Sequence, residues 1–133
     1  MKNILFAEDD ANIVEIYRDS LLREGFDVPV AGDGLAAMRS LHQTKPDLII
    51  LDLIMPKFDG IDVLKFIRAN PALKDIKVII FSNATPTADI VLNAERIGAD
   101  AFVLKLTCTP EKLISVIKPL LRDDLAGEEN LKN

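Results

Sequence analysis

Short apolar segments alternate with helical patterns along the whole chain. Each apolar segment ends at polar or turn-forming residues, which is typical of strands buried on both faces of a sheet. Between the segments, apolar residues recur every three or four positions, as on the inner face of an amphipathic helix. We therefore predict five strands, at residues 3–7, 27–31, 47–51, 77–81 and 101–104.

Each predicted strand is followed by a helical pattern, which favours a parallel sheet with right-handed crossovers and helices on both faces. Thr85-Pro86 and Thr109-Pro110 each place an N-cap before a proline at the first helical position. Pro119 lies inside the last helical pattern, so that helix should kink or end near Lys118. We predict one α/β domain over residues 1–121 and a polar, frayed C-terminal tail over residues 122–133.

Composition narrows the class of protein. The 133 residues are 49% hydrophobic and 28% charged, which fits one globular domain. The net charge of −5 argues against direct binding to nucleic acid or to an anionic membrane surface. Cys108 is the single cysteine, which suits a reducing compartment. With no apolar run near the ~20 residues of a membrane helix, we expect a cytoplasmic protein.

Side chains suited to chemistry follow four of the predicted strands. Because the carboxyl ends of parallel strands meet at one edge of a sheet, ligands bind there and these side chains should lie together. The residues at the strand ends are Glu8, Asp9 and Asp10 after the first strand, Asp52 after the third, Ser82 and Asn83 after the fourth, and Lys105 after the fifth.

This set of side chains favours phosphoryl transfer to an aspartate. The first turn has no glycine-rich phosphate loop, and its clustered carboxylates suit a hard divalent cation such as Mg²⁺. Lys105 and Ser82 are unsuited as metal ligands, but both can donate to phosphoryl oxygens. Asp52 would then be the nucleophile, beside a cation and a lysine.

These motifs, in this order, resemble those of a response-regulator receiver domain, the family of the bacterial chemotaxis regulator. They are Ile4-Leu5-Phe6-Ala7-Glu8-Asp9-Asp10, Asp52-Leu53-Ile54-Met55-Pro56, Asp59-Gly60, Ser82 and Lys105. The resemblance covers nearly all of residues 1–121. It implies a flavodoxin-like (βα)5 fold with strand order 2-1-3-4-5, in a stand-alone receiver of a two-component system.

The resemblance also implies a role for each acidic residue. Asp52 would accept a phosphoryl group from a histidine on a sensor histidine kinase or a histidine phosphotransfer protein. Mg²⁺ would be bound by Asp9 and Asp52, by Glu8 through water, and by the backbone carbonyl of Ile54. The chain would be a regulatory domain that assists its own phosphorylation and dephosphorylation, and not an enzyme with a separate substrate.

Three further residues have implied roles in the response to phosphorylation. Lys105 would contact the phosphoryl group, Ser82 would move toward its oxygens, and Phe102 matches the family's aromatic switch position. The switch would reshape a face built from the helix over residues 87–97, the last strand and the last helix. A downstream protein partner would bind that face.

The chain departs from the family pattern at several positions near the site. Leu106 stands where the family usually has a proline after a cis bond, so the Lys105-Leu106 bond is expected to be trans, or cis and strained. Phe102 lacks the hydroxyl of the tyrosine often found there. Ile54 and Asn83 should alter the lifetime of the acyl phosphate.

Other interpretations stay open. Asp10 and Asp59 fit helix caps better than ligands. An aspartate-nucleophile phosphatase of the haloacid-dehalogenase kind would need a second Asp where Ile54 stands. A flavodoxin-like binding module is disfavoured because the acidic first loop would repel the phosphate of a flavin. A degenerate receiver that acts only as a protein-binding scaffold is the further alternative, because of Leu106.

Overall fold

The computed structural model describes residues 2–85 and 87–132 of the chain. Within these ranges, strands and helices alternate as the sequence pattern predicts. The elements are β1 (Ile4–Ala7), α1 (Ala11–Arg23), β2 (Val30–Ala31), α2 (Gly34–Gln43), β3 (Leu48–Leu51), α3 (Gly60–Ala69), β4 (Lys77–Ser82), α4 (Asp89–Ile97), β5 (Ala101–Leu104), the 3-10 turn η1 (Lys105–Thr107) and α5 (Pro110–Lys132).

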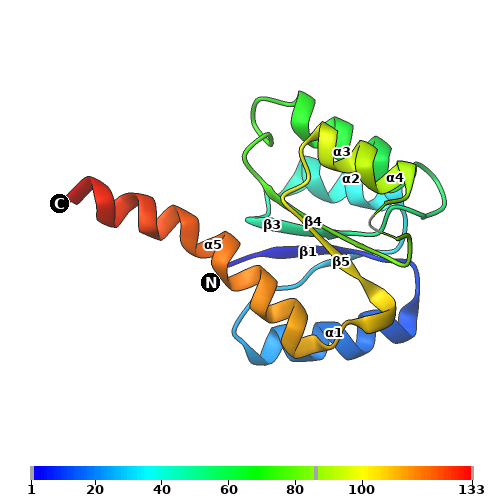
Figure 1. Cartoon of the computed structure of the whole chain (residues 1–133), viewed down its shortest axis with the longest axis horizontal. Coiled ribbons are helices and arrows are strands. Elements are labelled where there is room, and N and C mark those ends of the chain that lie inside the picture. The colour runs from blue at the N-terminus through cyan, green and yellow to red at the C-terminus, as the bar shows by residue number, and fades with distance from the viewer. Residues whose placement is uncertain (1, 86, 133) are drawn as a thin grey trace.

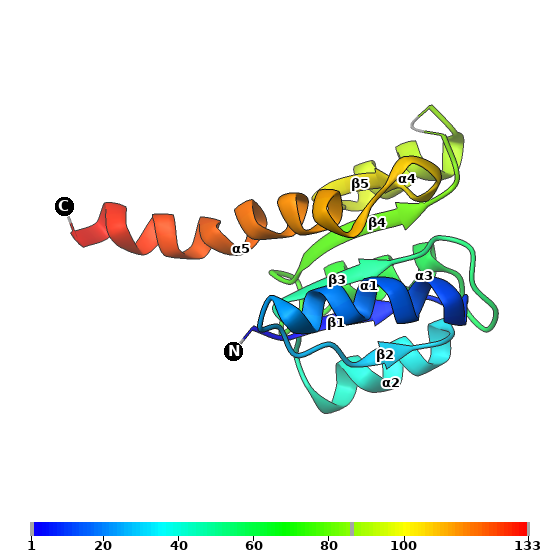
Figure 2. The same cartoon turned by 90° about the horizontal axis from the view of Figure 1, so that it is seen from below.

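The strands form one parallel sheet in the order β2-β1-β3-β4-β5. Figure 1 shows α2, α3 and α4 on one face of this sheet and α1 and α5 on the other. Seen from below in Figure 2, α1 lies in front of the strands, and α5 continues beyond the sheet toward the C-terminus. The doubly wound, flavodoxin-like α/β fold and the strand order 2-1-3-4-5 are therefore confirmed.

Successive side chains along each strand point to opposite faces of the sheet, so the core is divided into two layers. In β4, Val78 and Ile80 pack toward α2, α3 and α4, whereas Ile79 and Phe81 pack toward α1 and α5. Both layers are apolar because a parallel strand covered on both faces has no solvated side. The polar side chains are left to the strand ends, where the candidate site lies.

The second strand is shorter than predicted. Its ladder covers Val30 and Ala31, and Asp27 makes only an isolated bridge with Asn3. Pro29 lies between these two contacts and has no N–H to donate, although its carbonyl accepts a hydrogen bond from the Phe6 amide at 2.9 Å. The proline is tolerated because β2 is an edge strand.

The predicted start of the fourth helix is wrong. The helix α4 begins at Asp89 with Ala88 as its N-cap, which offers no capping side chain. The Thr85 carbonyl instead accepts a hydrogen bond from the Ala88 amide at 3.0 Å, which forms a separate turn; Pro86 lies outside the described residues. The corresponding prediction at Thr109 is confirmed, since its hydroxyl oxygen accepts from the Lys112 amide at 3.2 Å.

The last helix does not end near Lys118. It continues through Pro119 to Lys132, so the backbone of residues 122–132 is helical where a frayed tail was expected. A proline inside a helix leaves the carbonyl four residues earlier without its partner. Here Pro119 and Ser115 are both exposed, so water can satisfy that carbonyl. The domain boundary at residue 121 stays a prediction.

Candidate functional site

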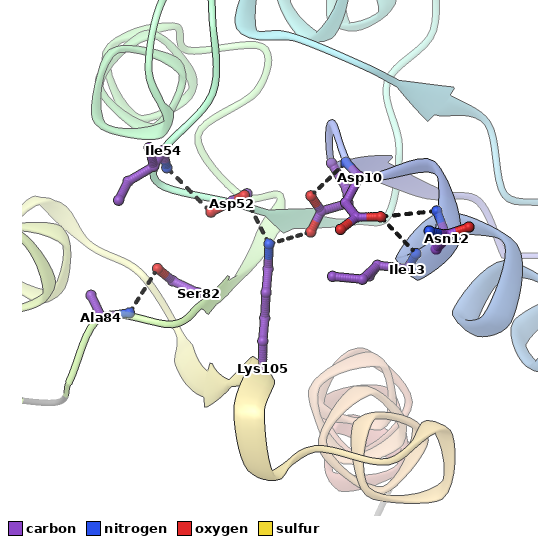
Figure 3. Close-up of polar contacts among 9 residues, drawn as sticks. Asp10, Asn12, Ile13, Asp52, Ile54, Ser82, Ala84 and Lys105 are labelled. Atoms are coloured by element: carbon purple, nitrogen blue, oxygen red, sulfur yellow. Dashed lines mark hydrogen bonds and ion pairs between the residues drawn. The ribbon is translucent and has the colours of Figure 1, made fainter.

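The strand ends bring together the side chains that the sequence singled out. Figure 3 shows Lys105 extending from the segment after β5 toward Asp52, with Ser82 beside it at the end of β4. Glu8, Asp9 and Asp52 each offer a carboxylate oxygen, and these oxygens lie within 4.8 Å of one another. Glu8 and Asp52 are buried, with 1% and 6% of their surface exposed, whereas Asp9 is exposed.

The Lys105 ammonium bridges two carboxylates. Its Nζ donates to Asp52 Oδ2 at 2.9 Å and forms an ion pair with Glu8 Oε1. The lysine side chain is itself only 10% exposed. A buried carboxylate is costly unless it is paired, so this lysine stabilises both acids inside the fold.

Burial and pairing shift the ionisation of this group of residues. Burial raises the pKa of the Glu8 carboxyl, and the contact with Lys105 offsets that rise only in part. Burial alone would lower the pKa of Lys105, but its contacts with Asp52 and Glu8 outweigh burial and leave that pKa above its usual value. Lys105 therefore carries its positive charge throughout the neutral range.

The backbone around β3 fixes the position of Asp52. The Ile54 amide donates to Asp52 Oδ1 at 3.2 Å, and the Gly60 amide donates to the Leu53 carbonyl at 2.9 Å. A Cβ atom at Gly60 would lie 2.3 Å from the Asp52 carbonyl oxygen. Only glycine permits the start of α3 to approach the end of β3 this closely.

A cavity of about 440 Å³ opens beside Asp52. Ser82, Asn83, Lys105 and the exposed Ile54 also line it. The buried Ser82 hydroxyl oxygen accepts from the Ala84 amide at 3.2 Å, within its own loop. Phosphoryl-sized groups could therefore reach Asp52, Ser82 and Lys105 from one space.

Phe102, the predicted switch residue, does not line this cavity. It is half-buried and packs against the apolar layer on the α2, α3 and α4 face of the sheet. Its backbone pairs with Ile80 in β4, two residues before Ser82. The two predicted switch residues thus belong to adjacent strands, Phe102 to β5 and Ser82 to β4.

Two acidic residues cap helices, as the sequence predicted. Asp10 Oδ1 accepts from the amides of Asn12 and Ile13 at 2.9 and 3.3 Å, at the start of α1. Asp59 Oδ1 accepts from the Asp62 amide at 3.0 Å, at the start of α3. Both carboxylates are used by backbone N–H groups, so neither is needed to explain the candidate site.

The bond between Lys105 and Leu106 is trans. Lys105 nevertheless reaches Asp52, so a cis bond is not required for its direction in this chain. Leu106 is 84% exposed and follows the lysine in the η1 turn. This observation counts against the degenerate-scaffold alternative, which depended on a misdirected lysine.

Sequence reasoning missed one residue beside the site. Lys105 Nζ lies 5.5 Å from the centroid of the Phe81 ring. Phe81 is read from the sequence as an ordinary core residue of β4, because its neighbours alternate as they do in any buried strand. Its place directly before Ser82 is the only signal that could have drawn attention to it.

The acidic residues fit a divalent cation. Three carboxylates converge, and the buried Glu8 Oε1 accepts no well-aligned hydrogen bond from any described residue, although it is ion-paired with Lys105. Hard oxygen ligands, one of them exposed, suit an ion that keeps part of its water shell. The acidic group could therefore bind a metal ion.

The fold and the residues at its strand ends match the receiver domain that the sequence motifs resemble, and comparison with known families agrees. The family model described as "Response regulator receiver domain" matches residues 4–118. The chain therefore belongs to the response regulator receiver domain family of two-component signalling.

Individual relatives support this assignment. The chain is 36% identical over 129 residues to the DNA-binding response regulator MtrA of Mycolicibacterium paratuberculosis, covering 96% of this chain and 55% of that protein. A receiver domain of a histidine kinase from Syntrophus aciditrophicus superposes with a TM-score of 0.84 at 32% identity, covering 92% of each chain. The Mn²⁺-bound response regulator Rcp1 gives a TM-score of 0.75 at 29% identity, covering 92% of this chain and 88% of that one.

One sequence-based prediction is overturned by these comparisons. The negative charge predicted no nucleic-acid partner, but the relative MtrA is a DNA-binding regulator. The chain spans about half the length of that relative. The charge of a receiver domain therefore does not decide what a longer regulator binds. Separately, none of the described helices combines the length and the apolar character that crossing a membrane requires.

Proposed function

We propose that this chain is the phosphoacceptor receiver of a two-component phosphorelay. Asp52 takes a phosphoryl group from a histidine on a partner kinase or phosphotransfer protein. The observation that carries the proposal is the Lys105 ammonium, which is held against Asp52 beside a cavity that Ser82 also lines. The domain of residues 1–121 regulates other proteins and assists its own phosphorylation and dephosphorylation, in the cytoplasm that the single cysteine suggests.

In the transfer, an oxygen of the Asp52 carboxylate forms a bond to phosphorus while the bond from phosphorus to the donor nitrogen breaks. The electron pair of the broken bond stays on the imidazole, which takes up a proton. Lys105 stabilises the charge on the phosphoryl oxygens, and preorganised groups of this kind typically contribute about 10²–10³-fold in rate. The Ile54 amide holds the second Asp52 oxygen in place.

The metal in this proposal is Mg²⁺, which would neutralise phosphoryl oxygens when bound. Asp9 and Asp52 would hold it directly, Glu8 through water, and the Ile54 carbonyl would complete the protein ligands. The convergence of three carboxylates supports this assignment. So does the likeness to Rcp1, which has been solved with Mn²⁺ bound.

Phosphorylation of Asp52 would add about −1.5 to −2 charges and strong acceptor oxygens. Ser82 would leave the Ala84 amide and donate its hydroxyl to those oxygens. Phe102, on the neighbouring strand, would fill the space that Ser82 vacates. The two residues together would carry the change from the site to the outer surface of the domain.

The test is to incubate the chain with acetyl phosphate and Mg²⁺ and to measure its intact mass. We expect one phosphoryl adduct on the wild type and none on Asp52→Asn. Asp59→Asn is the matched control, because asparagine caps a helix as well as aspartate does. That variant should still be phosphorylated.

Two results would contradict the proposal. Absence of any adduct at all Mg²⁺ concentrations would support the scaffold alternative. Steady release of phosphate from several unrelated phosphate esters, dependent on Asp52, would support the phosphatase alternative.

A further inference from the structure

The Lys105 ammonium lies over the aromatic ring of Phe81 and also contacts Asp52. Lys105 Nζ is 5.5 Å from the centroid of Phe81, while the same atom donates to Asp52 Oδ2 at 2.9 Å. A cation within about 6 Å of a ring centroid is attracted by the negative face of the ring. The attraction is stronger where water is excluded, and here the lysine is 10% exposed and Phe81 is 1% exposed.

The ring of Phe81 is held firmly. Phe81 belongs to β4, and its backbone pairs with Val103 in the neighbouring strand. Tyr17 meets the ring edge-on, with centroids 5.1 Å apart, and Phe6 packs against it at 6.1 Å with a tilt of 53°. These contacts come from α1 and β1, so the ring is fixed by several elements of the sheet and its α1 and α5 face.

The backbone near Lys105 gives the side chain less guidance. Lys105 begins the η1 turn, and the Leu106 that follows is 84% exposed, so the Leu106 side chain anchors nothing. The lysine side chain is a flexible stem of four carbons that ends in a compact charge. The side chain alone therefore does not fix where its ammonium points. Some contact outside the turn must therefore select the direction of the ammonium.

The carboxylate partners of Lys105 cannot serve this purpose in every state. Asp52 would itself change chemically on phosphorylation, and Glu8 would turn part of its charge toward a bound metal. The Phe81 ring is uncharged and changes in neither event. Its contact with Lys105 would therefore persist while the ionic partners are exchanged.

We propose that Phe81 is a positioning residue that holds the Lys105 ammonium over its ring and so directs it at the phosphoryl group on Asp52. The inference rests on the proposed phosphoacceptor function. In this chain the ring does what a fixed backbone bend after the lysine would otherwise do. A cation–π contact of this kind is worth about a three- to tenfold change in rate.

The first experiment measures the rate of adduct formation with acetyl phosphate at saturating Mg²⁺, by intact mass against time. Phe81→Leu should slow the reaction about three- to tenfold. Phe26→Leu is the matched control, because Phe26 packs against the same apolar layer but lies beside Lys2 and Lys118, away from the candidate site. It should change the rate by less than about twofold, because the same ring is removed from the same layer without touching the contact between Lys105 and Phe81.

The second experiment separates ring electronics from ring volume. Phenylalanines carrying one, two and three fluorine atoms are placed at position 81, which weakens the negative face of the ring stepwise at nearly constant size. The rate should fall in the same order. The same series at position 26 should leave the rate unchanged.

A double-mutant cycle tests whether Phe81 acts through the lysine. In a Lys105→Ala background, Phe81→Leu should cause no further slowing, because coupled residues are not additive. Equal slowing in both backgrounds, or a flat fluorination series, would overturn the role of Phe81. Absence of any adduct on the wild type would instead overturn the proposed function, so the two failures can be told apart.

Discussion

Asp52 and Lys105 meet at 2.9 Å, but the protein holds them in different ways. Asp52 is placed by the backbone, through the Ile54 amide and the close approach of Gly60. Lys105 is placed by side chains that lie far away in the sequence, namely the carboxylates of Glu8 and Asp52 and the ring of Phe81. The acceptor side of the site, which is Asp52, is therefore fixed by backbone atoms. The lysine side, which is Lys105, is fixed by side chains and can be adjusted by substitution.

The largest effect should come from the backbone of the acceptor side. In Gly60→Ala the new methyl group would meet the Asp52 carbonyl oxygen at 2.3 Å and the Leu53 Cα at 2.6 Å. Backbone atoms cannot move aside as a flexible side chain can, so we expect a loss of about 3 kcal/mol or more in the free energy of unfolding. Urea denaturation measures it.

Gly32→Ala is the control for this variant, because a methyl group there would meet nothing within 4 Å. Its free energy of unfolding should change by less than about 0.5 kcal/mol. If both glycine variants were equally stable, Asp52 would not be fixed by close backbone packing, and the comparison of the two sides would fail.

The next largest effect should come from Glu8, one of the two carboxylates paired with Lys105. Glu8→Gln keeps the shape of the buried side chain but removes the charge that helps to hold a cation. Substitution of a partner in the outer shell of a metal typically weakens binding about 10–100-fold. We expect a shift of that size in the Mg²⁺ concentration that half-saturates the rise in unfolding temperature.

Asp10→Asn supplies the matched control for the metal measurement. Asp10 caps α1, and asparagine caps equally well, so stability should be retained. Its Mg²⁺ affinity should stay within a few-fold of wild type. A loss as large as that of Glu8→Gln would mean that bulk negative charge, and not the convergent group, attracts the ion.

The sequence could predict the acceptor side because topology alone determines it. In a parallel sheet the residue after each strand reaches the same edge, so Glu8, Asp9 and Asp52 had to converge. The direction of Lys105 could not be predicted in this way. It depends on which ring lies beneath one flexible side chain, and hydrophobic alternation marks Phe81 only as buried.

The errors in the predicted start of α4 and the predicted end of α5 also arise where the rest of the fold competes with a local pattern. Thr85 and Pro119 each give a local signal, for a helix start and for a helix end. The structure overrules both, through a turn closed by the Ala88 amide and through solvent exposure at Pro119. Local signals hold where nothing competes, as at Thr109, whose hydroxyl oxygen does accept from the Lys112 amide.

A smaller effect should come from the hydroxyl that secures the far end of the turn after Lys105. Tyr17 donates its hydroxyl to the Cys108 carbonyl at 3.0 Å. Tyr17→Phe keeps the ring against Phe81 and removes only this hydrogen bond, which should cost about 1 kcal/mol of unfolding free energy. Ser115→Ala, which removes an exposed hydroxyl that donates to the Lys112 carbonyl, should cost less than about 0.5 kcal/mol.

Tyr17→Phe can also be compared with Phe81→Leu in the phosphorylation assay. Tyr17→Phe should slow adduct formation less than Phe81→Leu, because the ring under Lys105 remains. A larger slowing in Tyr17→Phe than in Phe81→Leu would show that the turn, and not the ring, directs the lysine.

The smallest effect is expected at Leu106, although it adjoins Lys105 in the chain. Its side chain is 84% exposed and its peptide bond to Lys105 is trans, so neither packing nor bond geometry at this position directs the ammonium. Leu106→Ala should change the free energy of unfolding by less than about 0.5 kcal/mol and leave the phosphorylation rate within about twofold of wild type. Leu113→Ala removes the same atoms from a fully buried position and should cost about 2–5 kcal/mol. A marked loss of phosphorylation in Leu106→Ala, with stability intact, would place control of Lys105 in the turn itself and remove the distinction between a backbone-held acceptor and a side-chain-held lysine.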